Sequence, residues 1–161
     1  MFAVQGRNCL IPRQRKEYLF KYITGIVGKR EQKLLAINGM SDHIHVLVGM
    51  TTSVALSDLV RYIKAGSSGF INDRKWVRGR FNWQEGFGAF SYSRSQVDQV
   101  VKYIQNQEQH HLKTTFREEY VEMLKVFAVE YDARYLFEWV DDGDAAEQVP
   151  RPQRDALTAN R

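Results

Sequence analysis

Two histidines, His43 and His45, are separated by a single residue in the run Asp42–Val48. The run is otherwise mostly apolar and predicts an extended strand, in which successive side chains point to opposite faces. Both imidazoles therefore stand on one face of the strand, close enough together to bind a metal ion. The same side chains could instead do no more than hydrogen-bond at the sheet surface, because histidine is common at intermediate burial. The pair by itself leaves both roles open.

A second group of polar residues lies on a predicted helix, where Tyr103 and Gln107 are four residues apart. The segment Ser95–Asp98 has the form of a capping box and predicts the start of this helix. Its buried stripe consists of Val97, Val100, Val101 and Ile104. Tyr103 lies beside the stripe, and Gln107 lies one turn further along the same flank. Such a tyrosine ordinarily packs half-buried, so the flank alone does not predict catalysis.

The order of the predicted elements indicates how these two groups are positioned. Strands are expected at residues 2–4, 33–37, 42–48 and 83–92, with a tight turn at Asn38–Gly39. Helices are expected from Pro12 to Gly28, from Ser53 to a frayed end at Gly66–Gly69, from Ser95 past Gln107, and from Phe116 to Tyr131. A short closing segment is expected at residues 136–139. This order predicts an α+β fold, a ferredoxin-like split βαβ antiparallel sheet with helices on one face.

The composition predicts a single folded domain over residues 1–140 and a flexible tail over residues 141–161. Hydrophobic residues make up 43% of the 161 residues, enough to form a core, but they are sparse after Asp141. The only cysteine, Cys9, excludes an internal disulfide bond and a thiolate metal site. No apolar run is long enough to span a bilayer and no signal segment is recognisable, so we expect a cytoplasmic protein with no membrane partner.

The formal net charge is +4, and the acidic tail means that the basic charge belongs to the folded domain. A basic surface favours a polyanionic partner, because neutralised phosphates release counterions. A basic surface that is simply solvated is the alternative, since net charge constrains function only loosely. Seven basic residues are candidates for contacts with nucleic acid: Arg61, Lys64, Lys75, Arg78, Arg80, Lys102 and Lys113.

The combination of His43-Ile44-His45 on a strand with Tyr103 and Gln107 on a later helix resembles the single-tyrosine HUH transposases. This family comprises insertion-sequence transposases, which mobilise single-stranded DNA, and the transposase-like proteins associated with repetitive extragenic palindromes. The similarity runs from about residue 4 to residue 139 and takes in the segments Asn38–His43, Trp83–Phe87 and Asn106–Glu108.

The resemblance implies a site and a substrate. His43, His45 and Gln107 would bind a divalent ion, magnesium or manganese, and Tyr103 would be the nucleophile. Residues 1–140 would be the catalytic domain of a DNA strand transferase and endonuclease. It would act as a homodimer on single-stranded DNA whose imperfect palindromes form hairpins. Family members usually have a longer first strand than the one this chain opens with, and in a ferredoxin-like sheet that strand should be central.

The chemistry of phosphodiester cleavage agrees with these residue types. A phenol is protonated at neutral pH and is a poor nucleophile, so its attack on phosphorus needs help. A metal ion on a non-bridging phosphate oxygen would draw off negative charge and hold the phosphorus in line with the phenol. The products would be a 5′-phosphotyrosine link and a free 3′-hydroxyl. The link conserves the energy of the broken phosphodiester bond, so no ATP is needed. The absence of a phosphate-binding glycine loop with lysine from the sequence agrees with this. Imidazole ligands alone would favour manganese, zinc and later metals over magnesium.

Two other hypotheses compete with an enzyme of this kind. A hairpin-DNA-binding protein derived from a transposase would have kept the fold and lost cleavage. The intact set of four site residues argues against this hypothesis, and the short first strand argues for it. A nucleotide hydrolase with a His-x-His-x-His run fails because Leu47 occupies the third position.

Overall fold

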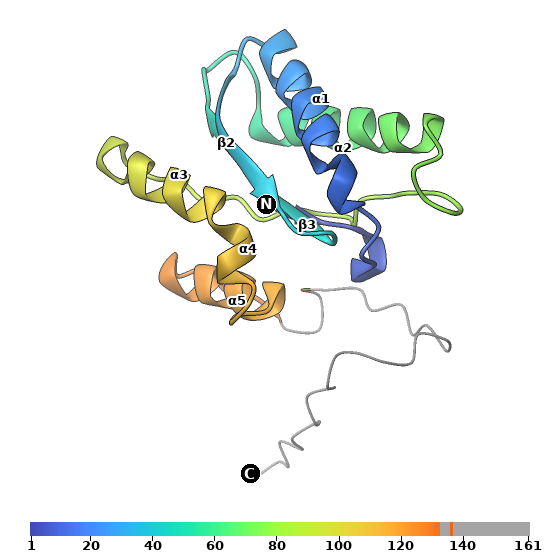
Figure 1. Cartoon of the computed structure of the whole chain (residues 1–161). Helices are drawn as coiled ribbons and strands as arrows, with labels where there is room; N and C mark the ends of the chain where they lie inside the picture. Colours follow the sequence, from blue (N-terminus) through green and yellow to red (C-terminus); the bar gives the residue numbers. More distant parts are fainter. Residues whose placement is uncertain (133–135, 137–161) are drawn as a thin grey trace.

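The structure, a computed structural model, describes residues 1–132 and Leu136 (Figure 1). The flexible tail expected at residues 141–161 lies outside the described residues, as does the closing segment expected at residues 136–139 apart from Leu136. None of the helices within the described part of the chain combines the length and the apolar composition needed to cross a membrane.

Three antiparallel strands form the sheet: β1 (Phe2–Ala3), β2 (Lys33–Gly39) and β3 (His43–Gly49). Their order is β1-β3-β2, so β3, which carries the histidine pair, lies in the middle. The register places Phe2 opposite Ile44 and Asn38 opposite His45. The histidines therefore lie at the centre of the sheet rather than at an edge.

Residues 82–88 lie along the other side of β1 and complete the ferredoxin-like arrangement. Val4 forms an isolated antiparallel bridge with Trp83, and backbone hydrogen bonds of 2.8 to 3.0 Å link the segment to the first five residues. In the regular sheet β1 is an edge strand, so the central position expected for it is reached only when this irregular segment is counted as its other neighbour. The expectation of a regular strand at residues 83–92 is wrong, because Gly86 has a φ of +75°, outside the extended conformation.

Within the described residues five α-helices accompany the sheet: α1 (Lys16–Lys29), α2 (Leu56–Asp73), α3 (Val97–Gln105), α4 (Gln107–His110) and α5 (Phe116–Val126). Short 3-10 turns occur at Gln5–Arg7, Arg13–Arg15 and Arg94–Gln96. The capping box before α3 begins two residues earlier than expected, with Ser93 as its first residue. A second capping box, Thr115 with Glu118, starts α5, which ends at Val126 rather than near Tyr131.

The α2 helix does not fray at Gly66–Gly69 as expected but continues to Asp73. Ser67 is fully buried within it, and its hydroxyl donates to the Ile63 carbonyl (2.6 Å) and accepts the indole N–H of Trp83 (2.8 Å). These bonds keep the serine helical, because its hydroxyl is satisfied without leaving the helix.

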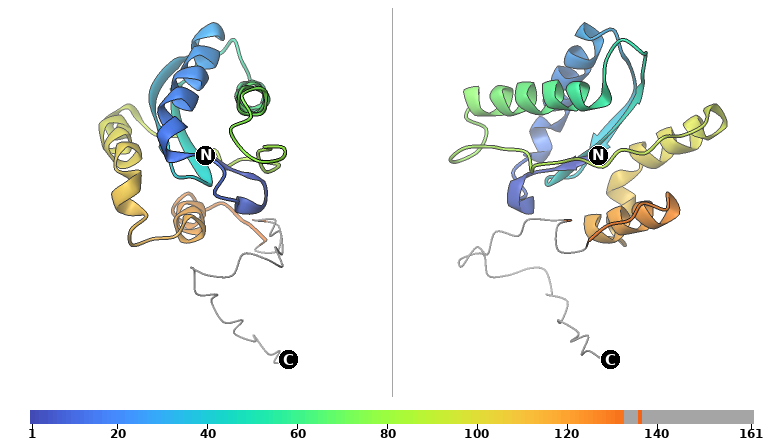
Figure 2. Two further views of the ribbon diagram at one scale, coloured as in Figure 1. Left: turned by 45° about the vertical axis from the view of Figure 1, so that its right-hand side comes forward. Right: turned by 180° about the vertical axis from the view of Figure 1, so that it is seen from behind.

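The two faces of β3 contact different helices (Figure 2). Ile44 is fully buried on the face covered by α1 and α2, in a core with Leu19, Ile23, Leu59 and Ile63. His43 and His45 point to the opposite face, where side chains of α3, α4 and α5 meet them. The expectation of helices on one face therefore holds for α1 and α2. The face that carries the histidines is covered by α3, α4 and α5.

The connection between β2 and β3 differs from the expected turn at Asn38–Gly39. Both residues belong to β2, and the chain reverses at residues 40–42. A Cβ atom at Gly39 would collide with the His43 carbonyl oxygen and lie 2.7 Å from the Ile44 Cα. Only glycine allows β2 to pass this close to the backbone of the histidine strand.

We therefore expect Gly39→Ala to lower the free energy of unfolding by about 1–3 kcal/mol, because the added methyl group meets backbone that cannot move without shifting β3. Urea denaturation followed by circular dichroism measures this change. Gly49→Ala is the matched control in β3, since its Cβ would meet nothing closer than 3.7 Å. Equal stability of the two variants would contradict this account of the hairpin.

Candidate active site

The histidine pair lies beneath the α3–α5 helices, and both rings are almost completely buried. His43 is 1% exposed and His45 is 4% exposed, and their ring centroids are 5.3 Å apart. Nδ1 of His43 is 2.8 Å from Oδ1 of Asp42, a carboxylate that can only accept, so Nδ1 carries the proton. This contact turns the Nε2 edge of His43 toward the centre of the cluster.

Gln107 reaches the same place from α4. The helix expected to run through Tyr103 and Gln107 is broken at Asn106, which ends α3 and precedes α4. The Gln107 side chain is fully buried, and its Oε1 lies 3.5 Å from Nε2 of His43 and 2.9 Å from Nε2 of His111. The break therefore does not separate the two predicted site residues, although they occupy different helices.

Two polar contacts hold α3 and α4 in this position. The Asn38 amide of β2 donates to the Gln105 carbonyl at the end of α3 (2.9 Å). The Lys16 ammonium at the start of α1 donates to Glu108 of α4 (3.0 Å), and Lys16 is itself mostly buried. These contacts join the tyrosine-bearing segment to β2 and to the start of α1 in its own chain.

Tyr103 extends from α3 toward the histidine pair. Its hydroxyl donates to Oε1 of Glu119, and its ring centroid is 6.2 Å from that of His45. All four residues singled out in the sequence, His43, His45, Tyr103 and Gln107, are thus brought together within one chain. Their roles as ligands and nucleophile stay predictions.

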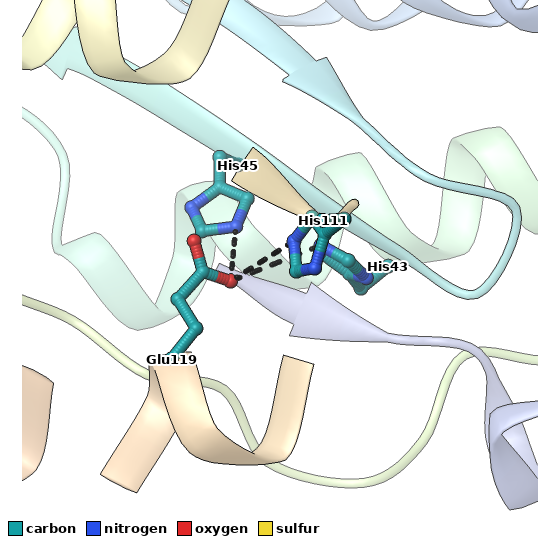
Figure 3. Close-up of side chains that lie close together, drawn as sticks. All are labelled: His43, His45, His111 and Glu119. Atoms are coloured by element: carbon teal, nitrogen blue, oxygen red, sulfur yellow. Dashed lines mark hydrogen bonds and ion pairs between the residues drawn. The ribbon is translucent and has the colours of Figure 1, made fainter. Parts of the chain in front are cut away.

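Two further residues, His111 and Glu119, complete the cluster and were missed in the sequence (Figure 3). Glu119 projects from α5 and is 2% exposed. Its Oε2 lies 3.2 Å from Nε2 of His45 and 3.3 Å from Nε2 of His111, and its Oε1 accepts from the Gln107 amide (2.9 Å). The available signal was periodicity, because Glu119 is an acidic residue on the helix face that Phe116 and Met123 predict to be buried.

The cluster has the dimensions and donor types of a metal site. One ligand atom from each of His43, His45, His111 and Glu119 can be chosen so that all lie within 4.8 Å of one another. Tetrahedral ligands at about 2.1 Å from one ion lie about 3.4 Å apart, so an inward shift of these side chains would bring all four within reach of an ion. Three imidazoles and a carboxylate suit manganese, zinc and related divalent metals.

Burial and hydrogen bonding set the protonation of these groups. Burial lowers the pKa of the His45 imidazole to about 4, which leaves it neutral, as a metal ligand must be. Burial opposes ionisation of Glu119, but its contacts with His111, His45 and Tyr103 outweigh burial and hold the pKa of Glu119 below its ordinary range. Burial and the adjacent Glu119 carboxylate raise the pKa of Tyr103, so the phenol is protonated in the resting site.

The seven candidate DNA contacts are spread over several elements. The Lys64 ammonium donates to the carbonyls of Gln84 and Gly86, so it holds the segment beside β1 rather than facing solvent freely. Arg61 is exposed and pairs with Asp58 (2.9 Å). The other five are exposed: Lys75, Arg78, Arg80, Lys102 and Lys113. Their contacts with nucleic acid stay predictions.

The fold and the cluster define an α+β protein of ferredoxin-like topology with a candidate metal centre. The family model of IS200-like transposases matches residues 1–107, about two-thirds of the chain. The chain belongs to this transposase family, and the resemblance found in the sequence is confirmed. A crystal structure of a candidate transposase from Deinococcus radiodurans R1 shares the fold, with a TM-score of 0.51 and 22% identity over 66% of this chain and 85% of that chain. No curated protein matches the chain.

Replacement of Asp42 tests how the His43 ring is oriented. We expect Asp42→Ala to weaken Mn²⁺ binding about 10–100-fold, because His43 loses the carboxylate that fixes its tautomer and ring orientation. Isothermal titration calorimetry measures the affinity, and Asp73→Ala, an exposed acid at the end of α2, is the control. Unchanged affinity in Asp42→Ala would show that this contact does not orient a metal ligand.

Proposed function

We propose that this transposase cleaves and rejoins single-stranded DNA through a covalent bond between Tyr103 and a 5′-phosphate. The observation that carries the proposal is the position of the Tyr103 hydroxyl. Although it is sixty residues from His43 in sequence, it belongs to the same buried hydrogen-bonded cluster as His45 and Gln107. A phenol placed beside paired imidazoles is what metal-assisted attack on phosphorus requires.

The three proposed ligands and the tyrosine have different roles in this reaction. His43, His45 and Gln107 hold a divalent ion, magnesium or manganese, through neutral ligand atoms. When bound, this ion supplies positive charge to a non-bridging oxygen of the scissile phosphate. Tyr103 attacks the phosphorus, so that the bond from the phenolic oxygen to phosphorus forms as the bond to the 3′-oxygen breaks, and the phenolic proton is balanced by the proton that the 3′-oxygen gains as a free 3′-hydroxyl. Attack by a 3′-hydroxyl on the same phosphotyrosine link reverses the step and joins two strands without ATP.

The buried surroundings support this division. His45 is neutral because of burial, which leaves a lone pair for the ion. The Asp42 carboxylate turns the Nε2 edge of His43 toward the same point. Tyr103 is half-buried at the rim of the cluster and lines a cavity of about 420 Å³ together with Tyr92, His110 and Phe127. This cavity would give a DNA strand access to the phenol.

Recognition of the DNA would rest on the exposed basic residues. We propose that Arg61, Lys75, Arg78, Arg80, Lys102 and Lys113 contact the phosphates of hairpins formed by imperfect palindromes, and that the active assembly is a homodimer. Phosphate contacts of this kind give binding that falls steeply with salt concentration. Lys64 is left out, since its ammonium already donates to two backbone carbonyls.

The nucleophile is tested by trapping the covalent adduct. The probe is single-stranded DNA carrying the imperfect palindromes that flank the gene, with a fluorescent label at its 3′ end, incubated with the protein and Mn²⁺. We expect a labelled protein band that resists denaturing electrophoresis in the wild type and disappears in Tyr103→Phe, which lacks the attacking oxygen.

Tyr18→Phe, an exposed tyrosine of α1, is the matched control and should form the adduct normally. An undiminished adduct in Tyr103→Phe would refute the assignment. Binding of the hairpin probe without any adduct in the wild type would instead support the alternative of a non-cleaving DNA-binding protein derived from a transposase.

A further inference from the structure

We propose that Glu119 of α5 is an additional metal ligand and that the same carboxylate positions Tyr103, so that one side chain couples the ion to the nucleophile. This inference rests on the proposed function. It also lies beyond the part of the chain that the family matches, because that match ends at residue 107, before α5 begins.

The two oxygens of Glu119 face two different groups, of which Figure 3 draws the imidazoles. Oε2 faces the imidazoles, at 3.2 Å from Nε2 of His45, 3.3 Å from Nε2 of His111 and 4.0 Å from Nε2 of His43. Oε1 faces the tyrosine side, where it accepts from the Tyr103 hydroxyl and from the Gln107 amide. An ion among the imidazoles would contact Oε2 while Tyr103 stays on Oε1.

The proton positions on two of the histidines point to a cation in this space. Nδ1 of His111 is 2.8 Å from the Thr114 carbonyl oxygen, which can only accept, so Nδ1 carries the proton. Nδ1 of His43 is protonated for the same reason, because it faces the Asp42 carboxylate. In their neutral forms both rings therefore present a bare Nε2 lone pair to the interior of the cluster.

Those lone pairs face other acceptors. Nε2 of His111 lies 2.9 Å from the amide oxygen of Gln107 and 3.3 Å from Oε2 of Glu119, and Nε2 of His43 lies 3.5 Å from the same amide oxygen. Converging acceptors in a buried site repel one another unless a positive charge lies between them. An extra proton on an imidazole could supply that charge, but each proton would join only one pair of acceptors. One divalent ion would contact all of these acceptors at once, and its binding would release such protons.

A carboxylate ligand would change what the site binds. His43, His45 and Gln107 alone offer only neutral donors, of which the imidazoles favour later transition metals. An anionic oxygen adds the ligand type that manganese and magnesium prefer. Glu119 would therefore shift the preference of the site toward these ions and hold the Tyr103 hydroxyl beside the ion. It acts on the reaction as a positioning residue as well as a ligand.

The test is Mn²⁺ binding to the full chain, measured by isothermal titration calorimetry and by the loss of the free Mn²⁺ paramagnetic resonance signal. We expect Glu119→Gln to weaken binding at least about tenfold, the lower end of the losses seen even for groups that only support a ligand. Glu122→Gln is the matched control, an exposed acid three residues further along α5, and should bind as the wild type does. Circular dichroism verifies that both variants fold.

His43→Ala separates this inference from the proposed function. If His43→Ala weakens Mn²⁺ binding and Glu119→Gln does not, Glu119 is not a ligand and only the inference fails. If neither variant changes binding, the metal site of the proposed function fails as well. At saturating Mn²⁺, Glu119→Gln should still form the DNA adduct more slowly than Glu122→Gln, because a neutral amide oxygen is a weaker acceptor for the Tyr103 hydroxyl than the carboxylate.

If Glu119→Gln fails to fold, a crystal of the wild-type chain soaked in Mn²⁺ shows directly whether Glu119 is a ligand. The anomalous peak is expected at about 2.2 Å from Oε2 of Glu119. A peak held by the histidines but more than about 3.5 Å from either Glu119 oxygen, beyond any coordinating distance, would overturn the proposal.

Discussion

The structure depends on a buried convergence of polar groups between the central strand and the last helices. Three imidazoles, one carboxamide and one carboxylate meet on the face of β3 that points away from the main apolar core. Burying these groups is unfavourable unless each finds a partner, so the elements that carry them must be held together. Glu119 is the common partner, because it contacts His45, His111, Gln107 and Tyr103.

The remaining elements can be understood as the frame for this convergence. The close approach of Gly39 to the His43 backbone sets the β2–β3 hairpin, and the hairpin sets which face the histidines occupy. The other face of β3 is anchored by Ile44 in the core beneath α1 and α2. On the histidine side, the Lys16–Glu108 pair joins α4 to the start of α1. Tyr103 can therefore reach the histidine pair of its own chain without a partner subunit.

Local pattern was enough to predict the part of the site that lies on regular elements. Alternation along β3 placed His43 and His45 on one face, and helical spacing placed Tyr103 and Gln107 on one flank. The break at Asn106 was not predicted, because no proline or glycine marks it. His111 was missed because it is recognisable only by its contacts, and Glu119 because an acidic residue on a helix predicts a solvated position, although helical spacing marks its face as buried. Glu119 looks like any acidic residue near the start of a helix until the burial of its face is known.

The fold was predicted from the same local patterns. The prediction failed where tertiary contacts override local conformational preference. The order of strands and helices was sufficient for the ferredoxin-like topology. The segment Gly66-Ser67-Ser68-Gly69 predicted the end of α2, but the Trp83 indole N–H and the Ile63 carbonyl satisfy Ser67 inside the helix. Strand-like composition at residues 83–92 predicted a regular strand, but Gly86 at positive φ interrupts it. The continuation of α2 depends on Trp83, which is distant from Ser67 in sequence.

The central claim is that the Tyr103 oxygen becomes bonded to the 5′-phosphate of cleaved DNA. Mass spectrometry of the trypsin-digested adduct tests it most directly, since cleavage after Lys102 and Lys113 isolates residues 103–113, in which Tyr103 is the only tyrosine. The account predicts that this peptide carries the nucleotide mass, with fragment ions placing it on Tyr103. A nucleotide on any other residue, or cleaved DNA with no modified peptide, would contradict it.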